Sequence, residues 1–187
     1  MVRTRRAVSV VALVLAAFAF AAPARADSQV QLDLQLGLGY ESVSPAFDCP
    51  GGCTWGETRG PGLLLGVGPT LTVDTIHVGL RVEAAATRLA DDAAGGTAGL
   101  LGLVGVDGPL TVEVGLGIGW MFYRRNQTAT DILHRLGPIV ALSVGTQLSE
   151  HVLLLGRLST HWLTDEMSAL FAGLVIEWRP LSRERFP

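Results

Sequence analysis

The chain has 187 residues, with 14 Lys or Arg against 17 Asp or Glu and a formal net charge of −3. An acidic balance of this kind argues against nucleic acid as a partner. Mean hydropathy is nevertheless +0.40, and no segment after the N-terminal region offers the roughly 18 consecutive apolar residues that a transmembrane helix needs.

The N-terminal segment has the form of a secretory signal peptide. A basic start, MVRTRR, is followed by an apolar run from Ala7 to Ala22 and by Ala24-Arg25-Ala26, which has the small-x-small pattern of a signal-peptidase site. We therefore expect residues 1–26 to be cleaved on export and residues 27–187 to form one domain. Four of the basic residues leave with the signal, so the exported chain is more acidic still.

The remaining chain alternates apolar with small or polar residues, which is the period of a β-strand. In VQLDLQLGLGY, Val30 to Tyr40, aliphatic residues occupy the even positions from 30 to 38. The 23 glycines would weaken any helix that they interrupted. The pattern predicts eight strands, each near or above the length of a tilted transmembrane strand. Their expected ranges are 30–40, 62–73, 76–87, 97–106, 110–123, 136–148, 152–162 and 169–178.

Short and long connections alternate between these strands. Turn-forming residues predict tight turns at 74–75, 107–109 and 149–151. Longer links are expected at 41–61, 88–96, 124–135 and 163–168. This alternation is typical of membrane barrels with short turns on one rim and external loops on the other. The sequence therefore predicts an all-β fold, an eight-stranded antiparallel up-and-down transmembrane β-barrel, with both termini at the short-turn rim.

The two faces of the predicted strands differ in composition. One is aliphatic, as at the even positions 76–84, and the other has small residues with a few charges. A water-facing surface would carry charge on roughly a quarter to a third of its residues, so the aliphatic face is expected to meet lipid and the other to line the lumen. A register shift or bulge is predicted at Pro69, which cannot donate a ladder hydrogen bond, and in the strand 97–106, where Leu101 and Leu103 fall on positions that face the lumen.

Charged residues of the inward face lie at broadly similar depth from the short-turn rim. Because isolated charges are very costly to bury, we expect a network in which Arg81 and Arg157 each lie between acidic partners. Such a network plugs or narrows the barrel, and a gated ion path lined by the same groups is the alternative. Its expected members are Asp33, Arg81, Glu83, Glu113, Arg157 and Glu177. The same face carries His77, Gln147 and His161.

Aromatic residues gather at the ends of the apolar face, as in the girdles at membrane interfaces. Tyr40, Trp120, Phe122 and Trp162 are expected at the long-loop end and Trp178 at the other.

Cys49 and Cys53 lie in the longest predicted external loop, where export makes a small disulfide ring the natural expectation. Zinc would need two further ligands, and no His lies nearby in the sequence, so no metal site is expected.

The signal peptide, the eight strands, the loop alternation and the closing segment Gly173-Leu174-Val175-Ile176-Glu177-Trp178 resemble small outer-membrane β-barrels of Gram-negative bacteria, such as the transmembrane domain of outer membrane protein A. The last strand looks like the signal that the family's barrel assembly machinery reads, although residues 179–187 follow it here. The resemblance implies location in the cell outer membrane, contact with its lipids and lipopolysaccharide, and no cofactor. Eight strands suffice to close a monomer.

Three roles remain open at this level. We expect a structural or surface-interaction barrel without catalytic residues, and the first alternative is a narrow, porin-like channel. The second is a lipid A-modifying hydrolase, because Ser159 and His161 lie two residues apart with Asp165 and Glu166 nearby. In the lipid A deacylases that are similar barrels, however, the histidine precedes the serine and the pair opens toward lipid.

Overall fold

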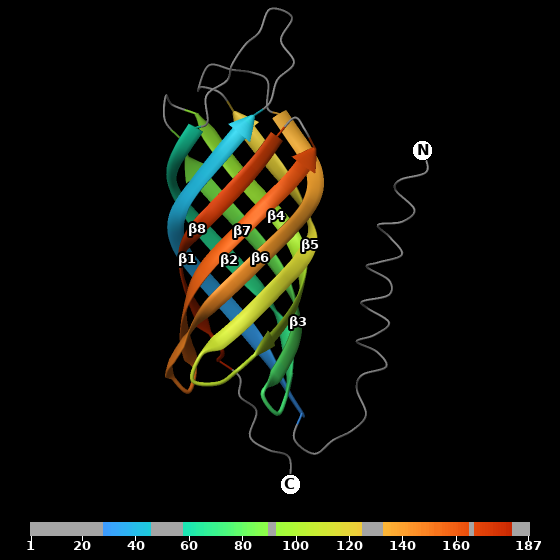
Figure 1. Cartoon of the computed structure of the whole chain (residues 1–187), viewed down its shortest axis with the longest axis vertical. Coiled ribbons are helices and arrows are strands. Elements are labelled where there is room, and N and C mark those ends of the chain that lie inside the picture. The colour runs from blue at the N-terminus through green and yellow to red at the C-terminus, as the bar shows by residue number, and fades with distance from the viewer. Residues whose placement is uncertain (1–27, 46–57, 90–92, 125–132, 165–166, 181–187) are drawn as a thin grey trace, which may run out of the picture.

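The computed structural model describes residues 28–45, 58–89, 93–124, 133–164 and 167–180, and its eight strands close into a barrel in which each strand pairs with its neighbours in the chain (Figure 1). All pairings are antiparallel, including the closing pair of the first and last strands. The strands are β1 Ser28–Pro45, β2 Thr58–Val73, β3 Ile76–Arg88, β4 Ala94–Val106, β5 Thr111–Arg124, β6 Leu133–Ser149, β7 Val152–Thr164 and β8 Met167–Trp178. The predicted fold class is confirmed.

The strands are longer than the sequence pattern indicates at the long-loop end. β1 continues to Pro45 and β2 already begins at Thr58, with Val43 paired to Thr58. The apolar and polar alternation fades in this region, but backbone pairing does not depend on it. At the short-turn end the predicted and observed bounds agree within a residue or two.

Closure of the barrel follows from a regular stagger of the strands. The interior row that starts at Gln31 passes through Thr70, Gly79, Leu103, Gly115, Ala141, Ser159 and Phe171 and returns to β1 at Glu41, ten residues further along. Stagger, strand number and tilt are linked, and barrels of this kind tilt their strands by about 35–45°. Eight strands enclose a lumen only wide enough for side chains.

The start of β1 and the end of β8 both lie at the short-turn rim. Ser28 at the start of β1 pairs with Val73, and Trp178 at the end of β8 pairs with Val152. Asp74 forms the tight turn between β2 and β3 with a φ of 56°, in the left-handed region that Asp tolerates better than most residues.

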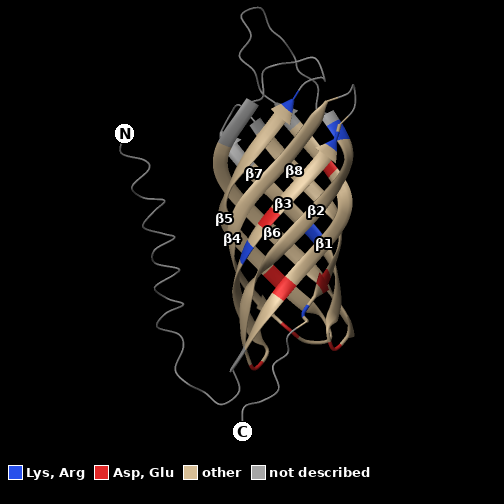
Figure 2. Ribbon diagram, turned by 180° about the vertical axis from the view of Figure 1, so that it is seen from behind, with Lys and Arg blue, Asp and Glu red and all other residues tan. Residues whose placement is uncertain are grey.

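The outward face is apolar around the barrel. Its exposed large side chains include Leu36, Leu65, Val82, Leu116 and Leu174. Figure 2 shows most acidic residues in the lower half and at the short-turn rim, and basic residues both at the long-loop rim and midway along the strands. None of the described segments forms a helix long and apolar enough to span a membrane.

Large apolar side chains also fill part of the lumen. Leu101 and Leu103 are buried there at 0% and 4% exposure, in a cluster with Ile139 and Ala141. Gly115 makes room for them, since a Cβ on it would lie 3.0 Å from both leucines.

The predicted register shift is wrong, because the register is the same on both sides of Pro69 and throughout β4, although the pairing of β2 with β3 is interrupted at Gly68 and Pro69. Pro69 points outward and the two leucines point into space that glycine leaves open. The register shifts instead between Gln147 and Ser149 and between Trp162 and Thr164. Gln147 is exposed rather than lumenal.

Candidate functional site

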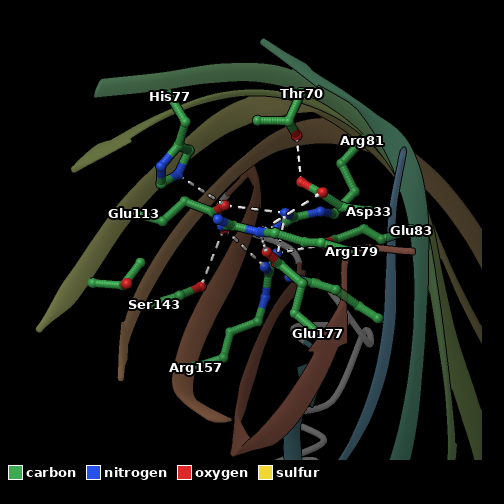
Figure 3. Close-up of polar contacts among 12 residues, drawn as sticks. Asp33, Thr70, His77, Arg81, Glu83, Glu113, Ser143, Arg157, Glu177 and Arg179 are labelled. Carbon is green, nitrogen blue, oxygen red and sulfur yellow. Dashed lines mark hydrogen bonds and ion pairs between the residues drawn. The ribbon is translucent and has the colours of Figure 1, made fainter. Parts of the chain in front are cut away.

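An arginine inside the lumen bonds to carboxylates that lie on two other strands. Arg81 of β3 donates from Nη1 to Glu113 Oε1 at 2.7 Å and from Nη2 to Glu113 Oε2 at 3.0 Å, and Nη2 also reaches Glu177 Oε2 at 3.1 Å. Glu113 belongs to β5 and Glu177 to β8, so the cluster ties opposite walls together (Figure 3). All three side chains are at most 4% exposed. Paired contacts between a guanidinium and a carboxylate are the strong form of this interaction.

Arg157 of β7 joins the same cluster from another wall. It is paired with Glu83 of β3, and its Nη1 lies 3.9 Å from Glu113 Oε1. Ser143 adds a longer hydrogen bond of 3.4 Å to Glu113. The structure thus places both inward arginines between acidic partners.

Uncharged donors add hydrogen bonds to the carboxylates of the cluster. Thr70 donates to Asp33, and Gln35 Nε2 donates to Glu177 Oε2 at 2.5 Å. Within the cluster the carboxylates outnumber the guanidiniums, so these neutral donors lower the cost of burying the excess negative charge.

The cluster extends to the short-turn rim through three residues absent from the predicted network. Arg179 follows β8, turns inward, and donates to Glu177 Oε1 at 2.8 Å and to Asp107 Oδ2 at 3.0 Å. His77 lies between Asp107, at 3.2 Å, and Glu113, at 3.6 Å. The sequence could have predicted an inward Arg179, because Arg179 lies two residues after the inward-facing Glu177 and so continues the alternation of the last strand. Asp107 gave no such signal, since its position in a turn has no assigned face.

The Asp107 carboxyl lies in the turn between β4 and β5 and is a quarter exposed. Burial alone raises its pKa, but the contacts with His77 and Arg179 outweigh burial and lower the pKa to about 2. Asp107 is therefore ionised at neutral pH and is held at the lower mouth of the barrel by two partners.

The upper lumen has a smaller polar group and more apolar packing. Thr87 donates to the buried Glu41. Val43, Leu89, Met121 and Tyr123 pack in a buried cluster near the long-loop end, together with Ala93 and Ala169. A second buried apolar cluster lies partly beside the charges, since Leu153 pairs with Glu177, and consists of Leu64, Ala85, Leu153, Leu155, Phe171 and Val175.

Ser159 and His161 point into the lumen, at 2% and 3% exposure. A hydrolytic triad is not assembled among the described residues, since they include no hydrogen bond between Ser159 and His161 and since residues 165–166 lie outside them. His161 Nδ1 is buried without a hydrogen-bond partner.

Four of the five predicted girdle aromatics are exposed on the outward face. Tyr40 is 53%, Trp120 57%, Phe122 42% and Trp178 49% exposed. The side chain of Trp162 lies outside the described residues, as do Cys49 and Cys53 and the signal segment. Within the described part of the chain no group of three or more His, Cys, Asp or Glu side chains is arranged so that it could hold a metal ion.

Comparison with known proteins identifies the fold. No family model matches the chain, and no curated protein matches its sequence. Among solved structures, Neisserial surface protein A superposes with a TM-score of 0.64 at 10% identity, covering 79% of this chain and 96% of that one. The N-terminal β-barrel domain of Pseudomonas aeruginosa OprF gives 0.54 at 12% identity, covering 81% and 98%. Ail, the attachment invasion locus protein of Yersinia pestis, gives 0.53 at 11% identity, covering 81% and 99%.

These identities show the fold alone. The chain has the architecture of the small eight-stranded outer-membrane barrels, and the resemblance inferred from the sequence is confirmed at that level.

Proposed function

We propose that the protein is an integral outer-membrane β-barrel with a structural or surface-interaction role, exported by means of residues 1–26 and closed inside by its own side chains. The observation that carries the proposal is the difference between the two faces of the barrel wall, apolar outside and charged inside. Leu36, Leu116 and Leu174 of the outer surface are more than half exposed, while Arg81, Glu113 and Glu177 are buried in the lumen. A soluble barrel would have the opposite arrangement. In water, so extensive an apolar surface would drive aggregation.

The height of the apolar face supports a bilayer as its surroundings. On β5 the outward residues from Val112 to Phe122 are all apolar or Trp and alternate with inward positions. The ten residue steps span roughly 34 Å along the strand at about 3.4 Å each. A tilt of about 40° reduces this to about 26 Å along the barrel axis, close to the ~25 Å apolar band of outer-membrane barrels.

The packing of the lumen supports a closed barrel. The charge cluster crosses its lower half. The apolar cluster around Phe171 lies partly beside the charges, since Leu153 pairs with Glu177, and the apolar cluster around Met121 lies near the long-loop end. A barrel of eight strands leaves little further room. We therefore propose that it forms no open pore and acts through its fold or external loops, as a monomer in contact with outer-membrane lipids and lipopolysaccharide after insertion by the barrel assembly machinery.

Membrane fractionation tests the location and planar bilayers test the closed lumen. The protein should stay with membranes through carbonate extraction and migrate faster on gels before boiling than after. The purified barrel should give no single-channel current. Release into the aqueous fraction contradicts the membrane proposal, and steady current contradicts the plug alone.

A narrow channel is the second candidate, and unpaired polar atoms favour it. Arg157 Nε and Nη1 and His161 Nδ1 are buried without hydrogen-bond partners. Buried polar groups are normally paired with protein or water, so lumenal water is the natural partner of these atoms. If such water is continuous, current should appear in bilayers and change in Arg81→Ala or Arg157→Ala.

A hydrolase has less support, because the seryl and imidazole groups of Ser159 and His161 face the lumen and are nearly inaccessible to lipid. Overexpression should therefore leave lipid A fully acylated. Deacylated lipid A that disappears in Ser159→Ala would establish the hydrolase instead.

A further inference from the structure

The seam between the first and last strands is shorter than the other side of β1. Pairing between β1 and β8 ends at Leu34 and Trp178, whereas pairing between β1 and β2 continues down to Ser28 and Val73. The lower end of β1 therefore has β2 on one side and no described strand on the other. An open strand edge of this kind is a template on which a further strand can pair.

The backbone hydrogen bond of Arg179 shows which β1 residues form this edge. The Arg179 backbone N–H donates to His151 O at 2.9 Å, so the backbone groups of residue 179 point toward β7. Because these groups point to alternate sides along a strand, those of Trp178 point toward β1, with which Trp178 pairs. Leu32 and Val30 precede the β1 partner of Trp178 by two and four residues. Their backbone groups therefore point to the side on which β8 has ended.

Pro180 explains why the pairing stops. It is the next residue after Trp178 whose backbone would face β1, where it would lie opposite Leu32, and a proline has no N–H to donate. Among the described residues no backbone hydrogen bond joins Leu32 and Pro180. A proline at a strand edge removes one ladder bond and does not prevent pairing beyond it. The next N–H on this side belongs to Ser182, which the same register places opposite Val30.

The residues that follow Pro180 fit the open edge in charge. Residues 181–187, LSRERFP, lie outside the described residues. Continuing the alternation from the inward Arg179 assigns Leu181 and Arg183 to the lumen side of the wall. Among the described residues of the charge cluster, carboxylates outnumber guanidiniums. An inward arginine at this mouth is therefore attracted rather than repelled.

We propose that residues 181–184 resume the pairing of β8 along the open edge of β1, in the existing register, with Ser182 opposite Val30. The chain's own segment is favoured over a separate strand because Pro180 holds it beside the edge, so pairing needs no second molecule. The paired segment closes the lower seam and covers an edge that could otherwise pair with another chain. This inference concerns the short-turn rim and does not depend on the role proposed above.

Cysteine cross-linking of the refolded exported chain tests the register, in a Cys49→Ser/Cys53→Ser background. Opposite residues of antiparallel strands have Cα atoms about 4.5–5.5 Å apart, within the range that a disulfide bridges. Val30→Cys/Ser182→Cys should therefore form an intramolecular disulfide under mild oxidation, seen on non-reducing gels. The matched control Val30→Cys/Leu181→Cys places the second cysteine on the opposite face, and it should cross-link at least about tenfold more slowly.

The control is strict because position 181 is nearer to Pro180, so a segment that does not pair would cross-link there at least as fast. Equal rates, or a faster reaction at position 181, overturn the proposal. A disulfide-linked dimer in place of the intramolecular product shows that a second copy occupies the edge, and it overturns the assignment to the chain's own segment.

Amide hydrogen exchange, followed by NMR in detergent micelles, tests the pairing itself. In the proposed ladder the Val30 N–H donates to Ser182 O, so a chain that ends at Pro180 should exchange the Val30 amide about tenfold faster or more. The Leu34 amide faces Trp178, which this chain retains, and should be unchanged.

A pair of variants at position 182 tests the same bond in the full-length segment. Ser182→Pro interrupts the ladder as Pro180 does opposite Leu32 and should also speed exchange at Val30, whereas Ser182→Ala should not. Heat-modifiable mobility first shows that each variant folds, and if the shortened chain does not, the comparison of Ser182→Pro with Ser182→Ala decides. Unchanged exchange at Val30 in Ser182→Pro overturns the proposal.

Discussion

Replacing Arg81 with methionine is the sharpest test of the lumenal cluster. The substitution removes two bonds to Glu113, at 2.7 and 3.0 Å, and one to Glu177, at 3.1 Å, while leaving both carboxylates buried. Removing one partner of a buried ion pair costs about 3–5 kcal/mol. Glu177 keeps Arg179 and Gln35 as donors. We therefore expect the free energy of unfolding to fall by an amount near the lower limit, about 3 kcal/mol.

The measurement is urea unfolding of the barrel in lipid vesicles, followed by tryptophan fluorescence and by heat-modifiable mobility. A double-mutant cycle with Glu113→Gln isolates the pair. Arg81→Met/Glu113→Gln should be more stable than the sum of the single losses predicts, by about 1–3 kcal/mol. Glu150→Gln, in an exposed turn, serves as the control and should stay within about 0.5 kcal/mol of wild type. A loss below about 1 kcal/mol in Arg81→Met, or zero coupling in the cycle, would refute the reasoning.

Acidification should weaken the contacts of Asp107, whose pKa of about 2 in the fold lies below the ~3.9 of an unfolded chain. The Asp107 carboxylate contributes to the free energy of unfolding above about pH 4, and this contribution is lost as pH falls toward 2. Over that interval the free energy of unfolding of wild type should fall by roughly 2 kcal/mol more than that of Asp107→Asn. Identical pH profiles of the unfolding free energy would contradict this. Val114→Arg on the outward face should destabilise the barrel in vesicles by about 2–4 kcal/mol, and a soluble, stable variant would contradict the membrane orientation. Gly99→Val should destabilise by about 1–3 kcal/mol, because even a Cβ at Gly99 would lie 2.3 Å from Ile139 Cδ1; Ile139→Ala in the same chain should recover part of that loss in urea unfolding.

The strands, their order and their orientation were accessible from the amino-acid sequence because they depend on local pattern. Alternation with a period of two assigns each side chain to a face, and short turns at positions such as Asp74-Thr75 bring successive strands together. The barrel of eight antiparallel strands agrees with that reasoning. So does the choice of outward face at Leu36 and Leu116, both exposed.

The same reasoning failed where neighbouring strands change the environment of a residue. Leu101 and Leu103 looked misplaced because parity points them inward, but the missing side chain of Gly115 on the next strand makes an inward leucine favourable. Arg59 and Arg88 were assigned to loops because the alternation fades, whereas continued pairing keeps them in strands.

The partners of the buried charges depend on the stagger of the strands. Arg81 meets Glu113 across 32 residues of sequence and Glu177 across 96, and no local pattern ranks these partners above other acidic residues. The ten-residue displacement on closure brings β3, β5 and β8 to the same level. Local alternation is set by the covalent geometry of the strand, whereas contact across a lumen is set by how all eight strands close, and this is why the charges could be found in the sequence but their pairing could not.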